Sequence, residues 1–347
     1  MPVDTEIAVL GLGRMGLEHC RQIRQTPGLK LVSASSRSAE ARRRAAELYS
    51  ATMFCSHEEL IEKTTAPWIV IATYTHEHAV WARQAISRGK NLIIEKPITL
   101  NYAEAEKIFK QADSRAVRVT VHQNRRWDRD FALVRKVLNQ GSLGQVYRIE
   151  SRCCYHSDSW TSGGAGGEQN QWRLKAEYGG GILTDWGSHL FDQLVLLSSA
   201  GVSGVLGKTE SRVWSREVED HFWAELFLDD GTMVRIEASN NHRIPLPRWV
   251  IIGTEGTLMV EGGEPERWST ARMRKSSNGF AEETTIDTSQ PEFSQGFYSA
   301  FQEALSANKP LPVQRREVLE AMRLIDAVKE SSIRMDLVRL AGPEGGH

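Results

Sequence analysis

Two short polar motifs in this chain carry side chains that could move a proton beside a reacting carbon. In the first, Glu95-Lys96-Pro97 follows the apolar run 92–94, so that Lys96 stands where a short buried strand ends. Pro97 fixes its own φ and biases Lys96 toward extended backbone, which makes the lysine a held group. A surface Glu-Lys pair between a strand and a helix is the alternative, and the tripeptide alone would favour it.

The second motif joins three glycines to an acid and a histidine. Gly179-Gly180-Gly181 precedes Asp185 and His189, and Asp192 follows them. On a helix, the spacing i, i+4 and i+7 places these three polar side chains on one face. The glycines allow the backbone to approach another element or a ligand. Such a face is more often a hydrogen-bonded helix contact than a catalytic set, and the presence of Lys96 upstream is what favours catalysis.

A glycine fingerprint lies near the N-terminus. Gly11-Leu12-Gly13-Arg14-Met15-Gly16 follows an apolar run and precedes a helical pattern, and this context is typical of a dinucleotide-binding loop. Gly11 allows the tight turn, Gly13 lets the backbone approach the pyrophosphate, and Gly16 allows close packing of helix on strand. The N-terminus of the following helix attracts the anion. A purely structural glycine turn is the alternative.

The residues after the second strand bear on the choice of cofactor. About twenty residues beyond the glycines, an NAD site carries Asp or Glu to accept from the ribose hydroxyls. This chain has Ser35-Ser36-Arg37 there. A guanidinium forms fork-shaped, charge-assisted bonds with a phosphate, which a carboxylate would repel. Ser36 and Arg37 therefore predict NADP(H), with NAD(H) left open.

The length of 347 residues indicates two domains, and the first third has the pattern of an α/β domain. Short apolar runs alternate there with amphipathic segments, which is typical of a parallel sheet with crossover helices. We expect strands at 7–10, 31–34, 68–72, 92–95 and 117–121, and helices at 17–25, 39–48, 76–87 and 103–112. Residues 1–123 are thus predicted to form a doubly wound, NAD(P)-binding Rossmann domain.

Residues 124–347 are predicted to form an α+β domain that binds the substrate. Alternating segments at 146–155, 221–228, 233–238, 249–252 and 257–260 predict an open, mostly antiparallel sheet, and helices are expected at 131–138, 181–197, 293–305 and 316–332. An open sheet needs cover on its second face, which the same face of a second copy supplies most simply. We therefore expect a homodimer or homotetramer. Trp223 is a candidate interface residue, although core packing explains it equally well.

Composition and charge exclude several classes of function. A net charge of −1 without a concentrated basic stretch argues against nucleic acid as a partner. No apolar run reaches membrane-spanning length and no signal peptide is visible, so a cytoplasmic protein that does not enter the membrane is expected. The four cysteines form no C-x-x-C pair. Cys153, Cys154 and His156 lie in an alternating strand that would point them to opposite faces, so no metal site is predicted.

Taken together, these motifs resemble those of the glucose-fructose oxidoreductase, inositol dehydrogenase and rhizopine catabolism family, called Gfo/Idh/MocA. The likeness covers roughly residues 5 to 335, and its most specific marks are Glu95-Lys96-Pro97 and the Asp185-x3-His189 pair behind three glycines. The resemblance implies that Lys96, Asp185 and His189 face the nicotinamide and the reacting carbon of a sugar or cyclitol. It also implies that four residues contact the cofactor: Thr73, His78, Glu95 and Lys96. The segment Asn124-Arg125-Arg126 would lie at the domain junction, with Arg126 as a substrate ligand.

Two departures from the family pattern stand out. Tyr74 occupies a position where proline is common, which puts the shape of the loop beside the cofactor in doubt. Ser36-Arg37 replaces the usual acid and puts the identity of the cofactor in doubt. Substrate specificity is expected from the second domain, where aromatic faces can stack on the C–H surface of a sugar ring. The candidates flank a glycine-rich stretch and are Tyr155, Trp160, Trp172 and Arg173.

The expected reaction is hydride transfer between a nicotinamide and a CH–OH group or its carbonyl. His189, oriented by Asp185, would act as general acid/base, and Lys96 would bind the substrate oxygen, stabilise alkoxide character and lower the proton affinity of the histidine. The roles of Lys96 and His189 can be exchanged. Two alternatives stay open: a dinucleotide-binding regulator without turnover, and an enzyme that acts on another carbonyl or imine, such as that of a dihydrodiol or a bile pigment.

Overall fold

The chain folds into two compact units. The computed structural model describes residues 4–157, 167–265, 268, 270–277, 280–288 and 296–340. One unit consists of residues 1–123 and 295–319, and the other of residues 124–294 and 320–347. The division expected from the sequence placed everything after residue 123 in the second domain, whereas the segment 295–319 belongs to the first unit.

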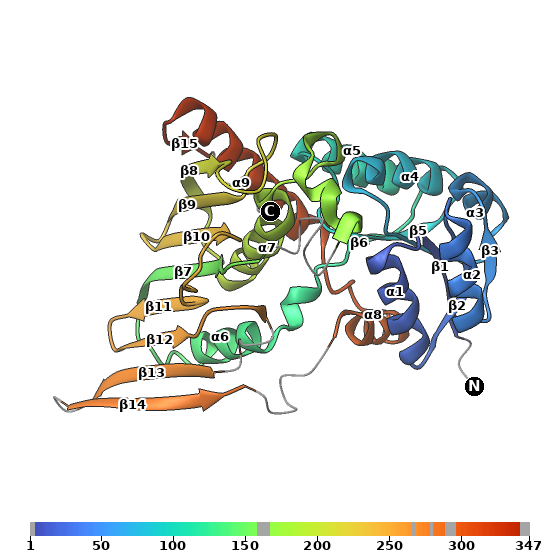
Figure 1. The fold of residues 1–347 in the computed structure, drawn as a ribbon. Coiled ribbons are helices and arrows are strands. Elements are labelled where there is room, and N and C mark those ends of the chain that lie inside the picture. The colour runs from blue at the N-terminus through green and yellow to red at the C-terminus, as the bar shows by residue number, and fades with distance from the viewer. Residues whose placement is uncertain are drawn as a thin grey trace. The chain divides into compact units, whose positions relative to one another are not determined.

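The first unit is built on a parallel sheet in the order β3-β2-β1-β4-β5-β6 (Figure 1). The strands are β1 (Thr5–Leu10), β2 (Leu29–Ser35), β3 (Thr52–Phe54), β4 (Trp68–Ile71), β5 (Asn91–Ile94) and β6 (Val119–Val121). The helices are α1 (Arg14–Gln25), α2 (Ala39–Leu48), α3 (His57–Lys63), α4 (Thr75–Ser87), α5 (Tyr102–Ser114) and α8 (Phe297–Ser306). This strand order is that of a doubly wound dinucleotide-binding fold, so the predicted Rossmann architecture is confirmed.

Helices cover both faces of this sheet. Helices α1, α2 and α8 lie on one face, and α3, α4 and α5 on the other (Figure 1). The sequence analysis missed β3 and α3, because a three-residue strand is too short to show a periodic pattern. Helix α8 belongs here because its apolar side packs on the sheet: the ring of Phe301 meets that of Trp68 edge to face at 4.9 Å.

The second unit is built on a mixed sheet in the order β14-β13-β12-β11-β7-β10-β9-β8-β15. The strands are β7 (Val146–Cys154), β8 (Val202–Glu210), β9 (His221–Leu228), β10 (Met233–Ser239), β11 (Trp249–Gly253), β12 (Gly256–Val260), β13 (Thr270–Ser277), β14 (Phe280–Asp287) and β15 (Val338–Arg339). Strands β7 and β10 pair in parallel, and the other strand pairs of this sheet are antiparallel. The predicted open, mostly antiparallel sheet is confirmed, with β8, β13, β14 and β15 added to it.

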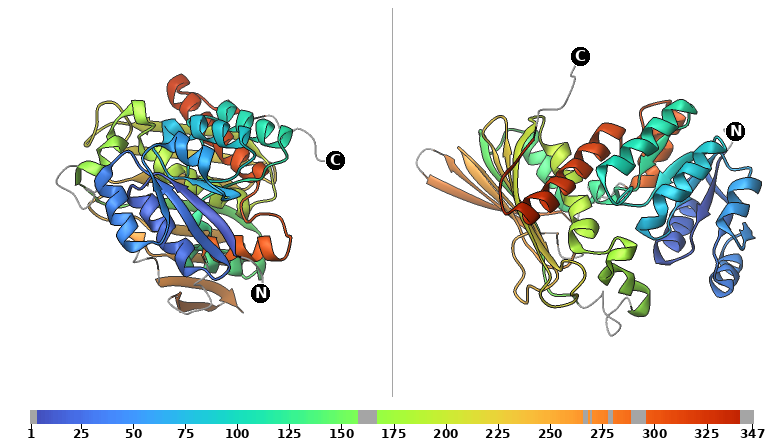
Figure 2. Two further views of the ribbon diagram at one scale, coloured as in Figure 1. Left: turned by 90° about the vertical axis from the view of Figure 1, so that its right-hand side faces the viewer. Right: turned by 90° about the horizontal axis from the view of Figure 1, so that it is seen from above.

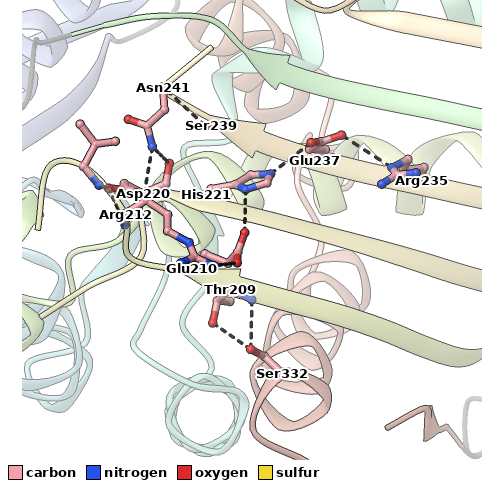
Figure 3. Close-up of polar contacts among 11 residues, drawn as sticks. Thr209, Glu210, Arg212, Asp220, His221, Arg235, Glu237, Ser239, Asn241 and Ser332 are labelled. Carbon is pink, nitrogen blue, oxygen red and sulfur yellow. Dashed lines mark hydrogen bonds and ion pairs between the residues drawn. The ribbon is translucent and has the colours of Figure 1, made fainter. Parts of the chain in front are cut away.

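The strand β8 shows why part of this sheet was not anticipated. Its sequence, VSGVLGKTE, contains two glycines and lacks the strict alternation of β9 and β10. Tertiary contacts stabilise it instead, because the hydroxyls of Ser331 and Ser332 on α9 (Arg315–Arg334) accept from the backbone N–H groups of Gly207 and Thr209 at 2.9 and 3.0 Å. Figure 3 includes the contact between Thr209 and Ser332. A helix thus covers donors that β8 would otherwise expose.

One predicted helix begins differently from the expectation. In place of one helix over 181–197, a π-helical turn at Leu183–Gly187 precedes α7 (Ser188–Leu197). Short π-helical segments are rare and occur frequently at functional sites. Among the described residues, no helix combines the length and the apolar character needed to cross a membrane.

The helices of the second unit pack on one face of its sheet, as the right-hand view of Figure 2 shows. There α7 and α6 (Arg129–Asn139) lie on the same face of the sheet. Phe191 of α7 stacks on Phe222 of β9 at 6.2 Å, and Phe131 of α6 stacks on Trp249 of β11 at 6.1 Å. These rings are fully or almost fully buried and form the centre of the core.

The opposite face of the sheet carries a network of charges. His221 on β9 lies between two carboxylates, with Nε2 3.1 Å from Glu237 and Nδ1 3.3 Å from Glu210 (Figure 3). Burial lowers the pKa of His221, but the hydrogen bond and charge of Glu237, followed by Glu210, more than offset this and raise it overall. Further ion pairs join arginines to glutamates along the same face. Arg148–Glu150 lies within β7 and Arg235–Glu237 within β10, whereas Arg152–Glu237 joins β7 to β10 and Arg235–Glu225 joins β10 to β9.

Candidate active site

The glycine turn after β1 has the shape that a dinucleotide requires. Gly11 has a φ of +100°, and a Cβ there would lie 2.6 Å from the carbonyl oxygen of Ala72. A Cβ on Gly16 would lie 1.9 Å from the carbonyl oxygen of Gly11. A Cβ on Gly13, by contrast, would meet no atom within 4 Å. Gly11 and Gly16 thus allow close packing. Gly13 leaves open space at the start of α1, where a pyrophosphate would bind. Arg14 and Met15 are the first residues of that helix.

The loop after β2 presents a guanidinium at the surface. Arg37 is 69% exposed in its side chain, and its Nη2 lies 3.1 Å from Oε1 of Glu77. Nη1 of Arg42 donates to the carbonyl oxygens of Ser36 and Arg37 at 2.6 and 3.1 Å, which fixes the loop to α2. The hydroxyl of Ser36 accepts from the N–H of Ser38 at 3.2 Å. Arg42 therefore has a structural role in this loop.

The carboxylate of Glu95 is turned into the interior of the first unit. Its Oε1 lies 2.8 Å from Nε2 of His19 on α1 and 2.8 Å from Nδ1 of His122 after β6. Nδ1 of His19 in turn lies 2.7 Å from the hydroxyl of Tyr298 on α8. Glu95 thus joins α1 to the segment after β6, and His19 extends this link to α8. The cofactor contact predicted for Glu95 stays a prediction, and the side chains that contact its Oε1 are those of His19 and His122.

Hydrogen bonding keeps this carboxylate ionised. Burial raises the pKa of Glu95, but the charge and hydrogen bond of His122 and those of His19 hold it well below its ordinary value of 4.5. Its Oε2 also accepts from the backbone N–H of Lys96 at 3.2 Å. Burial lowers the pKa of His19, with His122 acting in the same direction and Glu95 against it. A negative carboxylate beside neutral His19 is therefore the state that we expect at neutral pH.

His78 supports the same segment from the other side. Its Nδ1 lies 2.9 Å from the carbonyl oxygen of Pro97, and its Nε2 lies 3.2 Å from that of Thr73. The ring is 1% exposed, and burial lowers its pKa. His78 thus joins the loops that follow β4 and β5. The cofactor contacts predicted for His78, Lys96 and Thr73 stay predictions, and the side chains of Lys96 and Thr73 are half-buried.

In the second unit, the glycine run allows tight packing before the π-helical turn. Gly181 has a φ of +104°, and a Cβ there would lie 2.3 Å from Oε1 of Glu219. That carboxylate accepts from the N–H of Leu183 at 3.1 Å, and the carbonyl oxygen of Glu219 accepts from Ile182 at 3.0 Å. A Cβ on Gly180 would lie 2.3 Å from the carbonyl oxygen of Arg173. The predicted close approach of this glycine segment to another element is present in the structure.

The polar residues of this motif have different neighbours. Asp185, in the π-helical turn, accepts from Nε of Arg173 at 3.3 Å. Asp192 forms a two-bond ion pair with Arg126, with Nε to Oδ2 at 2.8 Å and Nη2 to Oδ1 at 2.6 Å. Both residues of this pair are almost fully buried. Arg126, predicted to bind substrate, therefore also ties the start of this unit to α7. His189 is 5% exposed and its ring lies edge-on to that of Trp186 at 5.9 Å.

Alternating arginine and tryptophan side chains connect the motif to the sheet. The guanidinium of Arg125 lies 4.3 Å from the ring centre of Trp186 and 5.5 Å from that of Trp268. The guanidinium of Arg248 lies 4.6 Å from Trp268 and 4.3 Å from Trp249. Cation–π contacts of desolvated groups contribute up to about 2 kcal/mol each. Sequence reasoning missed this stack because its members are dispersed over 144 positions of the chain, from Arg125 to Trp268.

The predicted specificity residues are partly described. Tyr155 meets Trp186 edge to face at 6.5 Å, and burial raises the pKa of its phenol. The guanidinium of Arg173 lies 4.4 Å from the ring centre of Trp172. Trp160 lies outside the described residues. Tyr155, Trp172 and Arg173 thus lie in the same unit as Asp185, and Tyr155 and Arg173 are each linked to the π-helical turn by a described contact.

Family models match both units of the chain. Residues 5–123 match the oxidoreductase family with an NAD-binding Rossmann fold, and residues 131–259 match the GFO/IDH/MocA C-terminal domain. An uncharacterized oxidoreductase of Schizosaccharomyces pombe is 31% identical over 277 residues, which cover 76% of this chain and 72% of the relative. The chain belongs to the Gfo/Idh/MocA family of oxidoreductases.

Two further similarities extend over most of the chain. A scyllo-inositol 2-dehydrogenase (NADP(+)) of Bacillus subtilis is 26% identical over 300 residues, which cover 79% of both chains. The crystal structure of an NAD-binding protein from Listeria innocua superposes with a TM-score of 0.85 at 27% identity and covers 99% of this chain and 98% of the other. The family resemblance inferred from the motifs is thus confirmed.

The neutral His19 predicts that stability decreases in acid. The pKa of His19 is lowered in the folded chain. As the pH falls below 6.5, the ordinary pKa of histidine, His19 therefore takes up a proton in the unfolded chain before it does so in the folded chain. The resulting stability is present above pH 6.5 and decreases as the pH falls, and the lowered pKa of Glu95 acts in the same direction below pH 4.5. His19→Gln should therefore reduce the slope of unfolding free energy against pH, below pH 6.5, by up to about 1.4 kcal/mol per unit.

Urea unfolding at a series of pH values from 8 downward measures this slope, with the data at pH 8 as the reference for the intrinsic cost of the substitution. Equal slopes for the variant and the parent chain would contradict the assignment of a neutral, buried His19.

Proposed function

We propose that the protein is an NADP(H)-dependent dehydrogenase or reductase that transfers hydride between the nicotinamide and a CH–OH group, or its carbonyl, of a polyol, cyclitol or sugar. One observation carries the proposal: the glycine turn, which leaves room only at Gly13, occurs together with a lysine fixed at the end of β5 by Glu95. A regulator has no need of a held lysine at the carboxyl end of the sheet, where ligands of doubly wound folds bind. Membership of an oxidoreductase family supports the same conclusion.

The roles of the residues follow from the balance of charge in the reaction. When an alcohol is oxidised, its hydroxyl proton must leave as hydride departs from the same carbon, and the bound nicotinamide supplies the acceptor for that hydride. We assign the proton to His189, with Asp185 as the residue that orients it, and assign binding of the substrate oxygen to Lys96. Glu95 is a positioning residue in this scheme, because it acts through the N–H of Lys96.

The position of Arg37 supports NADP(H) over NAD(H). Its guanidinium is largely exposed on the loop after β2, and Arg42 fixes that loop through two carbonyl oxygens. Glu77 is the one acid among the described contacts of Arg37, and it lies on α4, outside the loop. A guanidinium in this position can pair with a 2′-phosphate. The Bacillus subtilis relative is itself an NADP(+) enzyme.

The substrate class is supported by the side chains around the π-helical turn. Trp186 and Tyr155 present aromatic faces, while Asp185 and Arg173 offer an acceptor and a donor. Polyhydroxylated rings combine a C–H surface that packs on aromatic rings with hydroxyls that need such polar partners. The same relative is a scyllo-inositol dehydrogenase, which makes scyllo-inositol the first substrate to test.

The sheet face opposite the helices, which no helix covers in the described part of the chain, supports assembly into a homodimer or homotetramer as part of this proposal. Its arginines and glutamates alternate along neighbouring strands, so that a second copy can oppose each charge with its opposite. Trp223 on β9 is half-buried on this face, and the guanidinium of Arg235 lies 5.8 Å from its ring centre.

Replacing Lys96 by Ala should reduce kcat by about a hundredfold or more, because the developing alkoxide loses its cation. Binding of NADP(H) should change little. Absorbance at 340 nm measures turnover, and fluorescence titration measures the Kd of the cofactor. Lys107→Ala, on the exposed side of α5, is the matched control and should behave like the parent enzyme. Full activity of the Lys96 variant would remove the lysine from the mechanism.

Replacing Arg37 by Ala should raise the KM for NADP by at least about tenfold, since the loss of one charge-assisted phosphate contact costs about 1.4 kcal/mol or more. The KM for NAD should stay within about twofold, because NAD lacks the 2′-phosphate. Steady-state kinetics with both cofactors measures the change. Arg43→Ala serves as the control on the exposed side of α2. An equal loss for NADP and NAD, or a parent enzyme that prefers NAD, would refute the assignment.

Replacing Trp223 by Asp should dissociate the assembly, because a buried carboxylate without a partner is costly at an interface. Light scattering after size exclusion gives the mass directly. The control is Val213→Asp, in an exposed loop position. A parent protein with the 39.0 kDa mass of one chain would show that no assembly forms.

A further inference from the structure

A buried carboxamide in the second unit has no hydrogen-bond partner among the described residues. Asn240 is 5% exposed, and neither its Oδ1 nor its Nδ2 makes a hydrogen bond within the described part of the chain. The backbone carbonyl oxygen of Asn240, in contrast to its side chain, is paired: it accepts from the N–H of Ser157 at 3.0 Å. Leaving a buried polar group unpaired costs about 1–3 kcal/mol, and buried amides without partners are uncommon in folded proteins. The amide of Asn240 leaves both a donor and an acceptor unused.

The position of Asn240 in the fold relates it to the candidate active site. It directly follows Ser239, the last residue of β10, whose residues Val234, Ile236 and Ala238 are buried against the helices. Because side chains alternate along a strand, Asn240 continues the series of these three. The π-helical turn that carries Asp185 is in contact with β10. A polar group has thus taken an apolar position beside the catalytic motif.

The neighbouring strand places Tyr155 next to this amide. Strands β7 and β10 run in parallel with Cys154 opposite Ser239, so that Tyr155 and Asn240 follow at the same end. The N–H of Tyr155 donates to the carbonyl oxygen of Ser239 at 3.1 Å. The ring of Tyr155 lies edge-on to that of Trp186 in the π-helical turn. Since burial raises the pKa of this phenol, it stays protonated at neutral pH and keeps its O–H as a donor.

We infer that Asn240 is a substrate-binding residue that, with Tyr155, holds the hydroxyls of a polyol next to those that react. A carboxamide accepts at Oδ1 and donates at Nδ2, and a pair of vicinal hydroxyls offers the matching donor and acceptor. A purely apolar or a singly functional ligand would leave one of the two groups unpaired. The inference rests on the proposed function and extends it, because it selects substrates with at least two adjacent hydroxyls.

A substrate-binding role and a structural role of Asn240 predict different effects of its replacement on stability and activity. In a structural role, loss of the amide would remove hydrogen bonds and destabilise the fold. Asn240 makes no such bonds in the described chain, so replacing it by an apolar side chain removes an unpaired group and should leave the melting temperature unchanged or raise it. Asn241 is the matched contrast, because its Nδ2 donates to Oδ1 of Asp220 at 2.9 Å (Figure 3).

The experiment compares Asn240→Leu, Asn240→Ala and Asn241→Leu with the parent enzyme. For the two Asn240 variants, we expect the KM for scyllo-inositol to rise at least about tenfold, the KM for NADP to stay constant, and the melting temperature to be equal or higher. For Asn241→Leu, we expect a lower melting temperature and an unchanged KM. An unchanged KM for scyllo-inositol in the Asn240 variants overturns the inference, as does a drop in their melting temperature equal to that of Asn241→Leu.

A binding measurement distinguishes this inference from the proposed function. The shift in melting temperature that scyllo-inositol causes in the presence of NADP does not depend on turnover. If the parent protein shows this shift without any turnover, and the Asn240 variants lack it, the inference stands while the proposed dehydrogenase activity fails. If the parent turns over scyllo-inositol and the Asn240 variants match it in both KM and thermal shift, the activity stands and the inference fails. No shift in the parent protein overturns the inference.

Discussion

One buried carboxylate determines the arrangement around the proposed catalytic lysine. Glu95 is almost fully buried, so its charge is tolerable only because N–H donors surround it. Those donors come from α1, from the segment after β6 and from the N–H of Lys96, and Tyr298 on α8 fixes one of the two rings. The carbonyl contacts of His78 hold the next residue, Pro97. Helix α1, the backbone of the lysine and α8 are thus joined by one polar network within the first unit.

The second unit contains buried arginines that are paired with carboxylates. Arg126 and Arg248 are almost fully buried, and each has a carboxylate: Arg126 pairs with Asp192, and Nε of Arg248 lies 3.1 Å from Asp130. A buried ion pair of this kind adds little net stability compared with apolar residues, yet removal of one partner is strongly destabilising. Arg248 also bonds Ser151 and Gln193 at 2.7 and 2.6 Å, which joins β7 to α7. The segment that carries Asp185 and His189 is therefore supported by directional contacts.

The sequence permitted prediction of the fold wherever a periodic pattern was present. The Rossmann strands other than β3 and the glycine turn depend on local residue types, and each is found in the structure. The interior contacts of Glu95 and His78 were not predictable, because a motif shows which residues are adjacent in sequence and not which way a side chain turns. For Asn240 a signal was available: it extends the apolar positions 234, 236 and 238 with a polar residue. Whether its amide was paired could only be known from tertiary structure.

Residues 295–319 belong to the first unit although they follow most of the second unit in sequence, and this affects which fragments of the protein can fold. A fragment that stops at residue 123 would contain every Rossmann strand and the complete glycine turn, yet it would lack α8. It would expose the indole of Trp68 that Phe301 covers, and it would leave the imidazole of His19 without the phenol of Tyr298. A self-sufficient cofactor domain therefore requires a fusion of two separate stretches of the gene. A single truncation cannot produce it.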